Sequence, residues 1–104
     1  MLDQQPEECH VKKGLLVFEG KWNACVLYEL IKTPNRRFGE LRKAIPPISN
    51  TMLTSTLKNL EHLGLIKRVQ FNEIPPHVEY SLTESGRAII PVFDAIEHWS
   101  KEYL

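Results

Sequence analysis

The chain has 104 residues, of which 42% are hydrophobic and 25% charged, the size and composition of one globular domain with a modest core. No apolar run approaches the roughly 20 residues that a membrane span requires, and residues 1–8 lack the basic and apolar parts of a signal peptide. We therefore expect a cytoplasmic protein with no membrane partner. Its predicted organisation is a flexible N-terminal arm over residues 1–8 and a single domain over residues 9–104.

Charge is strongly segregated along the chain, although the formal net charge is zero. Between Lys32 and Arg68 the sequence holds eight basic residues and only two acidic ones, Glu40 and Glu61, so this segment carries +6 and the remainder −6. A basic block of this kind is typical of a surface that binds the phosphates of nucleic acid.

The residue types that carry most catalysis and metal binding are sparse and scattered. The two cysteines, Cys9 and Cys25, are too few for a disulfide scaffold, and no suitably spaced histidine pair completes a zinc site. No Gly-rich phosphate loop, carboxylate pair or nucleophile–base arrangement can be recognised. We therefore predict that the chain is not an enzyme and that it needs neither a metal nor another cofactor.

Three helices are predicted in the first half of the chain. Apolar residues at helical spacing indicate helices over residues 10–18 and 22–31, with Gly20 ending the first. The second must end before Pro34, since a residue that precedes proline is pushed out of the helical region. A third helix is predicted over residues 38–45.

The fourth predicted helix, from Asn50 to about Leu63, divides its side chains between two faces. Ser49 is a natural N-cap, and Gly64 is expected to close the helix in the left-handed conformation. Three leucines repeat at i, i+4 and i+7 and must face the core, whereas short polar and basic residues occupy the opposite face. The core-facing residues are Leu53, Leu57 and Leu60.

A hairpin and a last helix complete the predicted fold. Residues 66–71 and 78–82 alternate with period two, which indicates two strands. We expect Thr83 to cap the last helix and Pro91 to kink it, because proline removes a backbone hydrogen bond. The order of helix, tight turn, polar-faced helix and basic hairpin predicts a winged helix-turn-helix, a mainly α fold with a small β-hairpin wing (α+β).

The apolar stripe of the last helix is wide for so small a domain. We predict that it forms a homodimer interface with the first helix, and the alternative is a terminal helix folded back on its own core. The predicted interface residues are Val11, Leu15, Phe93, Ile96, Trp99 and Tyr103.

The polar face of the fourth helix and the basic residues around it predict binding of double-stranded DNA. Short polar or basic side chains on an exposed helix can read base edges in the major groove, whereas arginine and lysine beside it suit phosphates. The predicted base-facing residues are Ser49, Asn50, Thr51, Thr54, Ser55 and Lys58. The predicted backbone and wing contacts are Arg36, Arg37, Arg42, Lys43, Lys67, Arg68 and His77.

With these residues assigned, the chain resembles the HxlR-type family of bacterial winged-helix transcriptional regulators, which are related to the MarR regulators. The resemblance extends over nearly all of residues 9–103. It implies a homodimer that binds a pseudo-palindromic operator, with the first and last helices at the dimer interface. The motifs that carry it include Gly20-Lys21-Trp22, Arg37-Phe38-Gly39-Glu40-Leu41, Leu60-Glu61, Gly64-Leu65, Pro75-Pro76-His77-Val78-Glu79-Tyr80 and Trp99.

The same resemblance makes Cys9 a candidate redox sensor, because several members of that family sense electrophiles or oxidants through a cysteine just before the first helix. Nearby positive charge and a helix N-terminus favour the reactive thiolate, whereas Glu7 and Glu8 act in the opposite direction. An intersubunit disulfide or a mixed thiol adduct would be the switch. The alternative is an inert residue at the dimer edge. Cys25, within the second helix, is expected to be packed.

Two other functions remain open at this point. The same fold serves as a protein-interaction adaptor, although an adaptor has no need of the +6 block. A regulator of this kind can also respond to a small-molecule effector between the dimer helices, in a pocket lined by Trp22, Phe93 and Trp99, although these aromatic residues equally suit a core.

Overall fold

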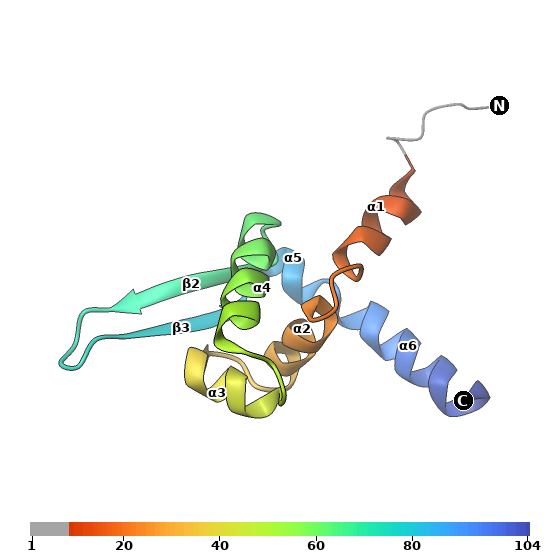
Figure 1. The fold of residues 1–104 in the computed structure, drawn as a ribbon. Coiled ribbons are helices and arrows are strands. Elements are labelled where there is room, and N and C mark those ends of the chain that lie inside the picture. The colour runs from red at the N-terminus through yellow and green to blue at the C-terminus, as the bar shows by residue number, and fades with distance from the viewer. Residues whose placement is uncertain (1–8) are drawn as a thin grey trace.

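The computed structural model describes residues 9–104, in which a small sheet projects on one side of the molecule and the helices near the two ends of the chain lie on the other (Figure 1). The predicted flexible arm, residues 1–8, lies outside the described residues. The architecture confirms the predicted α+β winged helix-turn-helix. None of the described helices is long and apolar enough to cross a membrane. The elements are α1 (His10–Val17), α2 (Asn23–Lys32), β1 (Arg36–Arg37), α3 (Phe38–Ala44), α4 (Asn50–His62), β2 (Ile66–Phe71), β3 (His77–Leu82), α5 (Glu84–Arg87) and α6 (Ile90–Tyr103).

The hydrophobic core lies between α2, α3, α4 and the sheet. As the sequence predicts, α4 turns Leu53, Leu57 and Leu60 into this core. Thr56 is also buried. Its hydroxyl is satisfied within its own helix, because it donates a hydrogen bond to the carbonyl oxygen of Met52 at 2.8 Å. The other buried apolar residues are Val26, Leu27, Leu30, Leu41, Ile45, Ile48, Ile66, Tyr80 and Leu82.

The sheet has three antiparallel strands in the order β1-β3-β2, one more than the predicted hairpin. The additional strand is β1, in which Arg36 lies opposite Tyr80 and Arg37 opposite Glu79. Two residues are too few to show the alternation by which a strand is recognised in sequence. This strand ties the start of α3 to the wing.

The turns around α4 agree with their sequence signals. The side-chain oxygen of Ser49 accepts a hydrogen bond from the backbone N–H of Met52 at 3.1 Å, which confirms Ser49 as the N-cap. Gly64 has a φ of 79°, the predicted left-handed conformation.

The C-terminal helical region differs from the prediction of one kinked helix. It consists of two helices, and Pro91 lies in the first turn of α6, where no backbone N–H is needed for an intrahelical hydrogen bond. Pro91 therefore helps to start a helix and does not kink one. Thr83 is an N-cap, as predicted, but of α5, where its Oγ1 accepts a hydrogen bond from the N–H of Gly86 at 3.2 Å.

The short helix α5 is closely fixed to the end of α4. The hydroxyls of Thr83 and Ser85 donate to the carbonyl oxygen of Gly64, at 2.6 and 2.9 Å. A Cβ on Gly86 would collide with the carbonyl oxygen of Leu65. Only glycine allows this close approach, which sets the direction in which the chain leaves the sheet.

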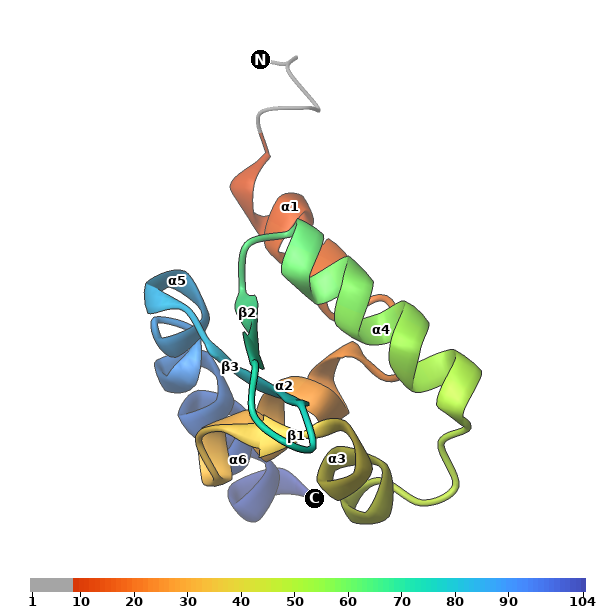
Figure 2. The same cartoon turned by 90° about the vertical axis from the view of Figure 1, so that its left-hand side faces the viewer.

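The two ends of the molecule have different characters (Figure 1). The wing projects from one side, where α3 and α4 also lie, and α1 and α6 diverge on the other. Figure 2 looks toward the side of the wing, with α4 beside it and α3 below. Neither α1 nor α6 has a buried residue.

Candidate nucleic-acid interface

The six predicted base-facing residues are all exposed on α4 or at its N-cap. Five of them line one open depression in the surface, and Ser49, whose side-chain oxygen is used by the cap, lies just before it. The side chains are short apart from the one lysine, so a groove floor can approach the helix closely. The five residues are Asn50, Thr51, Thr54, Ser55 and Lys58.

The last turn of α3 adds positive charge beside this helix. Arg42 and Lys43 are exposed there and have no ion-pair partner within residues 9–104. Their side chains are therefore available for phosphates, and the phosphate contacts stay a prediction.

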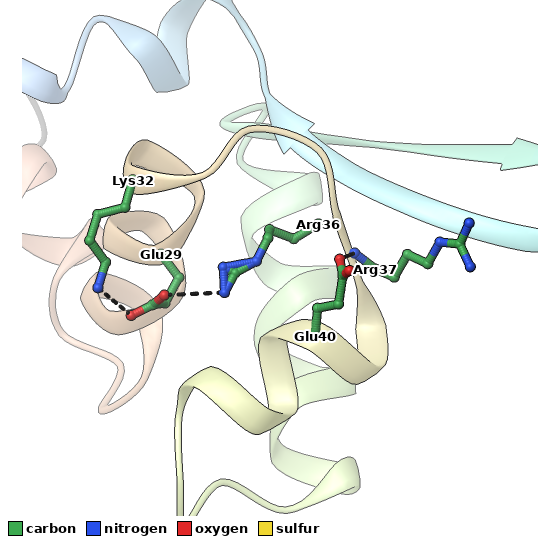
Figure 3. A network of polar contacts seen from close by, with 5 residues as sticks. All are labelled: Glu29, Lys32, Arg36, Arg37 and Glu40. Carbon is green, nitrogen blue, oxygen red and sulfur yellow. Dashed lines mark hydrogen bonds and ion pairs between the residues drawn. The ribbon is translucent and has the colours of Figure 1, made fainter.

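The two arginines of β1 have different surroundings (Figure 3). The guanidinium Nη2 of Arg36 lies 3.5 Å from Glu29 Oε1, and Lys32 Nζ lies 3.0 Å from Glu29 Oε2. The Arg36 side chain is only 14% exposed. Arg36 therefore anchors β1 to α2, and the structure does not present it to phosphates.

Arg37, in contrast, is exposed, and its side chain extends away from Glu40 (Figure 3). Its backbone N–H donates to Glu40 Oε1 at 2.8 Å, which fixes the start of α3. The position of the backbone is thus set while the guanidinium stays free for an outside partner.

Lys67 and Arg68 were predicted together, but neighbouring residues of a strand point to opposite faces of a sheet. Arg68 lies opposite Tyr80 and shares the face that packs on the core and α4, whereas Lys67 lies opposite Ser81 on the other face. The structure therefore brings only Arg68 to the α4 side of the wing.

His77 is the first residue of β3 and is held within the wing. Its ring stacks on Phe71 at a centroid distance of 4.8 Å. Nδ1 lies 3.4 Å from Glu73 Oε1 and Nε2 lies 3.1 Å from Glu79 Oε2, so both ring nitrogens have partners inside the hairpin. Ile74, which is fully exposed, lies at the tip instead.

Sequence reasoning missed Glu29, the residue that organises the cations behind β1. The i, i+3 spacing of Glu29 and Lys32 is a signal that the sequence offers. The ion pair of Glu29 with Arg36 depends on the turn at residues 33–35, where Asn35 adopts a φ of 59°. No local sequence pattern predicts this ion pair.

The predicted dimer residues are largely uncovered in the single chain. Val11 is 71% exposed, Leu15 62%, Trp99 54% and Tyr103 72%. Ile96 is also exposed. Phe93 differs because it packs within its own chain, with ring centroids 5.7 Å from Phe18 and 6.0 Å from Tyr28.

The two cysteines are both free. Cys9 is half-buried at the N-cap of α1, where its side chain makes no capping hydrogen bond. Cys25 was expected to be packed, but it is exposed. The reason is that α2 buries the neighbouring side of the helix, which carries Val26 and Leu27.

The three aromatic residues proposed to line an effector pocket have separate surroundings. Trp22 is half-buried against the core, with Lys21 Nζ 5.0 Å from its ring centroid. Phe93 stacks with Tyr28, and Trp99 contacts Tyr103 at 6.1 Å between centroids. These contacts favour packing and a subunit interface over a pocket.

Comparisons with known proteins agree with this geometry. Residues 17–104 match the model of the HxlR-like helix-turn-helix family. A helix-turn-helix transcriptional regulator from Methanothermobacter thermautotrophicus is 45% identical over 95 residues, which cover 91% of this chain and 72% of that protein.

Solved structures show the same similarity. A MarR-family transcriptional regulator from Porphyromonas gingivalis W83 superposes with a TM-score of 0.86 at 42% identity, covering 98% of this chain and 99% of that one. The redox regulator HypR in its oxidised form superposes with a TM-score of 0.81 at 38% identity, covering 92% of this chain and 98% of that one.

Proposed function

The chain belongs to the HxlR-like helix-turn-helix family of transcriptional regulators, and we propose that it binds a pseudo-palindromic operator as a homodimer. This membership makes it a DNA-binding regulator and not an enzyme, and it favours a regulator over the adaptor. The observation that carries the operator proposal is the row of short polar side chains on the exposed face of α4. A helix of this kind fits the major groove and reads base edges there.

Phosphate binding is assigned to the exposed cations around α4. Arg42 and Lys43 on α3 and Arg68 on the α4 side of the wing are exposed and do not share the base-reading role of the polar face. Arg37 is exposed as well, but it lies opposite Glu79 and therefore on the same face of the sheet as Lys67. Such contacts give affinity that falls with salt and carry no sequence information. Three predicted residues are left out of the phosphate-binding set. Arg36 and His77 already contact carboxylates of their own chain. Lys67 lies on the face of the sheet opposite to that of Arg68.

A second copy of the chain is the proposed partner of the uncovered α1 and α6. A two-fold dimer presents two recognition helices with the symmetry of a pseudo-palindrome. In Figure 1, α6 lies on the side of the molecule opposite the wing, and α1 comes close to α4 only at the C-terminal end of α4, where Leu16 and Asn59 line one pocket. Dimerisation through α1 and α6 therefore leaves the DNA-binding side open.

The experiment that tests DNA binding is a fluorescence anisotropy titration of the protein's own upstream DNA against a scrambled duplex, across a salt series. Asn50→Ala is expected to reduce the preference for the upstream DNA. Arg42→Gln is expected to weaken binding to both duplexes alike. It should also reduce the slope of log affinity against log salt concentration by about 1.

Lys21→Gln serves as the matched control, because Lys21 is an exposed cation outside the basic segment. It should leave both affinities unchanged. Equal affinity for the two duplexes in the unmodified protein, or equal effects of Arg42→Gln and Lys21→Gln, would contradict the assignment of the DNA-binding side.

We further propose that oxidation or alkylation of Cys9 switches DNA binding. The support is the half-buried position of Cys9 at the start of α1, next to the proposed dimer interface, together with the similarity to the redox regulator HypR. An adduct or intersubunit disulfide there changes how α1 packs, and hence the spacing of the two recognition helices.

The test compares DNA affinity of reduced and diamide-oxidised protein. Cys9→Ser should abolish the change on oxidation, whereas Cys25→Ser, which removes the exposed thiol of α2, should retain it. The proposal fails if the Cys9→Ser protein still responds or if the unmodified protein binds DNA equally in both states.

A further inference from the structure

The exposed face of α4 carries a narrow set of side chains. Over residues 50–57 it holds one amide and short hydroxyls, with no charged residue. The first cation of the helix is Lys58, and no arginine occurs anywhere in α4. An open depression of about 490 Å³ brings these side chains to one surface. The set of bases that this surface can read is correspondingly narrow.

The polar groups of this face have no partners in their own chain. Within residues 9–104, the side chains of Asn50, Thr54 and Ser55 make no hydrogen bond. Thr56, on the buried side, instead donates to the carbonyl oxygen of Met52 one turn earlier. Hydroxyls inside a helix often make this backbone bond, so those on the exposed face are free for a base edge.

Three of these residues follow one another along the helix at i, i+4 and i+8, namely Asn50, Thr54 and Lys58. Residues four apart lie one above the other on a helix face. At a rise of 1.5 Å per residue, Asn50 and Lys58 lie about 12 Å apart along the axis, and base pairs are stacked about 3.4 Å apart. A helix laid along the major groove therefore sets the amide and the cation about three to four base pairs apart.

Each of the three side-chain types matches a different base. An asparagine amide bonds N6 and N7 of adenine, a lysine donates to O6 and N7 of guanine, and the methyl group of threonine contacts the methyl group of thymine. Cytosine is read by an acidic acceptor, and residues 50–58 contain none. The order of side chains along α4 thus predicts an order of bases.

We propose that each half of the operator contains an adenine bound by Asn50 and a guanine bound by Lys58 about three to four base pairs away. A thymine between them contacts the methyl group of Thr54. This inference rests on the proposed operator function and adds the bases that the operator must hold. The alternative is readout of DNA shape alone, in which α4 contributes no base preference.

The first test selects binding sites from a random duplex library with the purified protein and its variants. The unmodified protein should enrich a two-fold motif that contains the A·T and G·C pairs. Asn50→Ala should lose the preference at the A·T pair and keep it at the G·C pair, and Lys58→Gln should do the reverse. Asn59→Ala is the matched control, because Asn59 is the other amide of α4 but lines a pocket beside Leu16 of α1.

Modified bases in the selected site test single atoms by fluorescence anisotropy. Replacing the adenine with 7-deazaadenine removes N7 and should weaken binding of the unmodified protein at least about threefold. Replacing the thymine with uracil should weaken it about fourfold, the effect of one buried methyl group. Asn50→Ala should lose only the deazaadenine effect, and Thr54→Ser only the uracil effect, so each variant is the control for the other.

The outcomes separate the choice of bases from operator binding itself. A G·C pair at the position that depends on Asn50, equal motifs for Asn50→Ala and Asn59→Ala, or a deazaadenine effect that persists in Asn50→Ala would overturn the assigned bases. Operator binding would stand in these cases, because a motif is enriched. If the unmodified protein enriches no motif, operator binding and this inference are refuted together.

Discussion

The middle and the ends of this chain use similar apolar residues in opposite ways. Leu27, Leu41 and Leu53 are fully buried between α2, α3, α4 and the sheet, whereas Val11, Leu15 and Trp99 on the terminal helices stay more than half exposed. The middle of the chain forms a hydrophobic core from its own residues. The ends present exposed apolar residues at helical spacing that no other part of residues 9–104 covers, which is the pattern expected of helices that pack across a subunit interface.

The largest expected effect lies in the core of the middle region. Leu27→Ala should lower the free energy of unfolding by about 2–5 kcal/mol, because it removes buried methyl groups and leaves a cavity. Urea denaturation followed by circular dichroism measures it. A loss below about 1 kcal/mol would mean that the middle region does not depend on this packing.

At the ends, the same kind of truncation should act on association. Trp99→Ala should weaken dimerisation by roughly 2–4 kcal/mol, the range of an aromatic residue at the centre of an interface, as measured by sedimentation equilibrium. Val69→Ala is the control, since Val69 is 39% exposed on the wing. The contrast between the ends and the middle of the chain is contradicted if the Trp99→Ala and Val69→Ala proteins dimerise with equal affinity.

The junction between the two regions passes through Gly86. Gly86→Ala should cost roughly 1–3 kcal/mol of unfolding free energy, because its methyl group meets the backbone of Leu65, which cannot move freely. Gly39→Ala in α3 is the matched control, since no atom lies within 4 Å of the added Cβ. Thermal denaturation should show destabilisation only for the first; similar melting temperatures would argue against the close approach.

The smallest effect concerns ion pairs in the two regions. Glu29→Gln should cost about 1 kcal/mol of unfolding free energy, because it leaves the half-buried Arg36 without its charged partner. Glu97→Gln on α6 should cost less than about 0.5 kcal/mol, since its pair with Lys101 is exposed and 4.0 Å long. Chemical denaturation of both variants side by side tests this order, and a reversed order would contradict it.

Sequence patterns predict the fold well wherever the determining interactions are local. The whole of α4 follows from its leucine spacing, the Ser49 cap and Gly64, all of which act within one or two turns. The separation of α5 from α6 was missed because Pro91 has two meanings, a kink inside a helix or a favourable first turn. The structure ends α5 at Arg87 and begins α6 at Ile90, so Pro91 has the second meaning here.

The candidate site shows the same limit. The polar row on α4 could be predicted, since a single helix displays it. The separate positions of Arg36 and Lys67 could not, because they depend on Glu29 across the α2–β1 turn and on the register of β2 with β3. The run of basic residues therefore predicts that the proposed DNA-binding side is positively charged, but not which of the cations lie on it.

The account of an operator-binding homodimer is tested most directly by a hydroxyl-radical footprint on the protein's own upstream DNA. We expect two protected patches related by a two-fold axis and separated by about one helical turn of roughly 10 base pairs or a multiple of it. A single protected patch, or uniform weak protection indistinguishable from that on random duplex, would contradict the account.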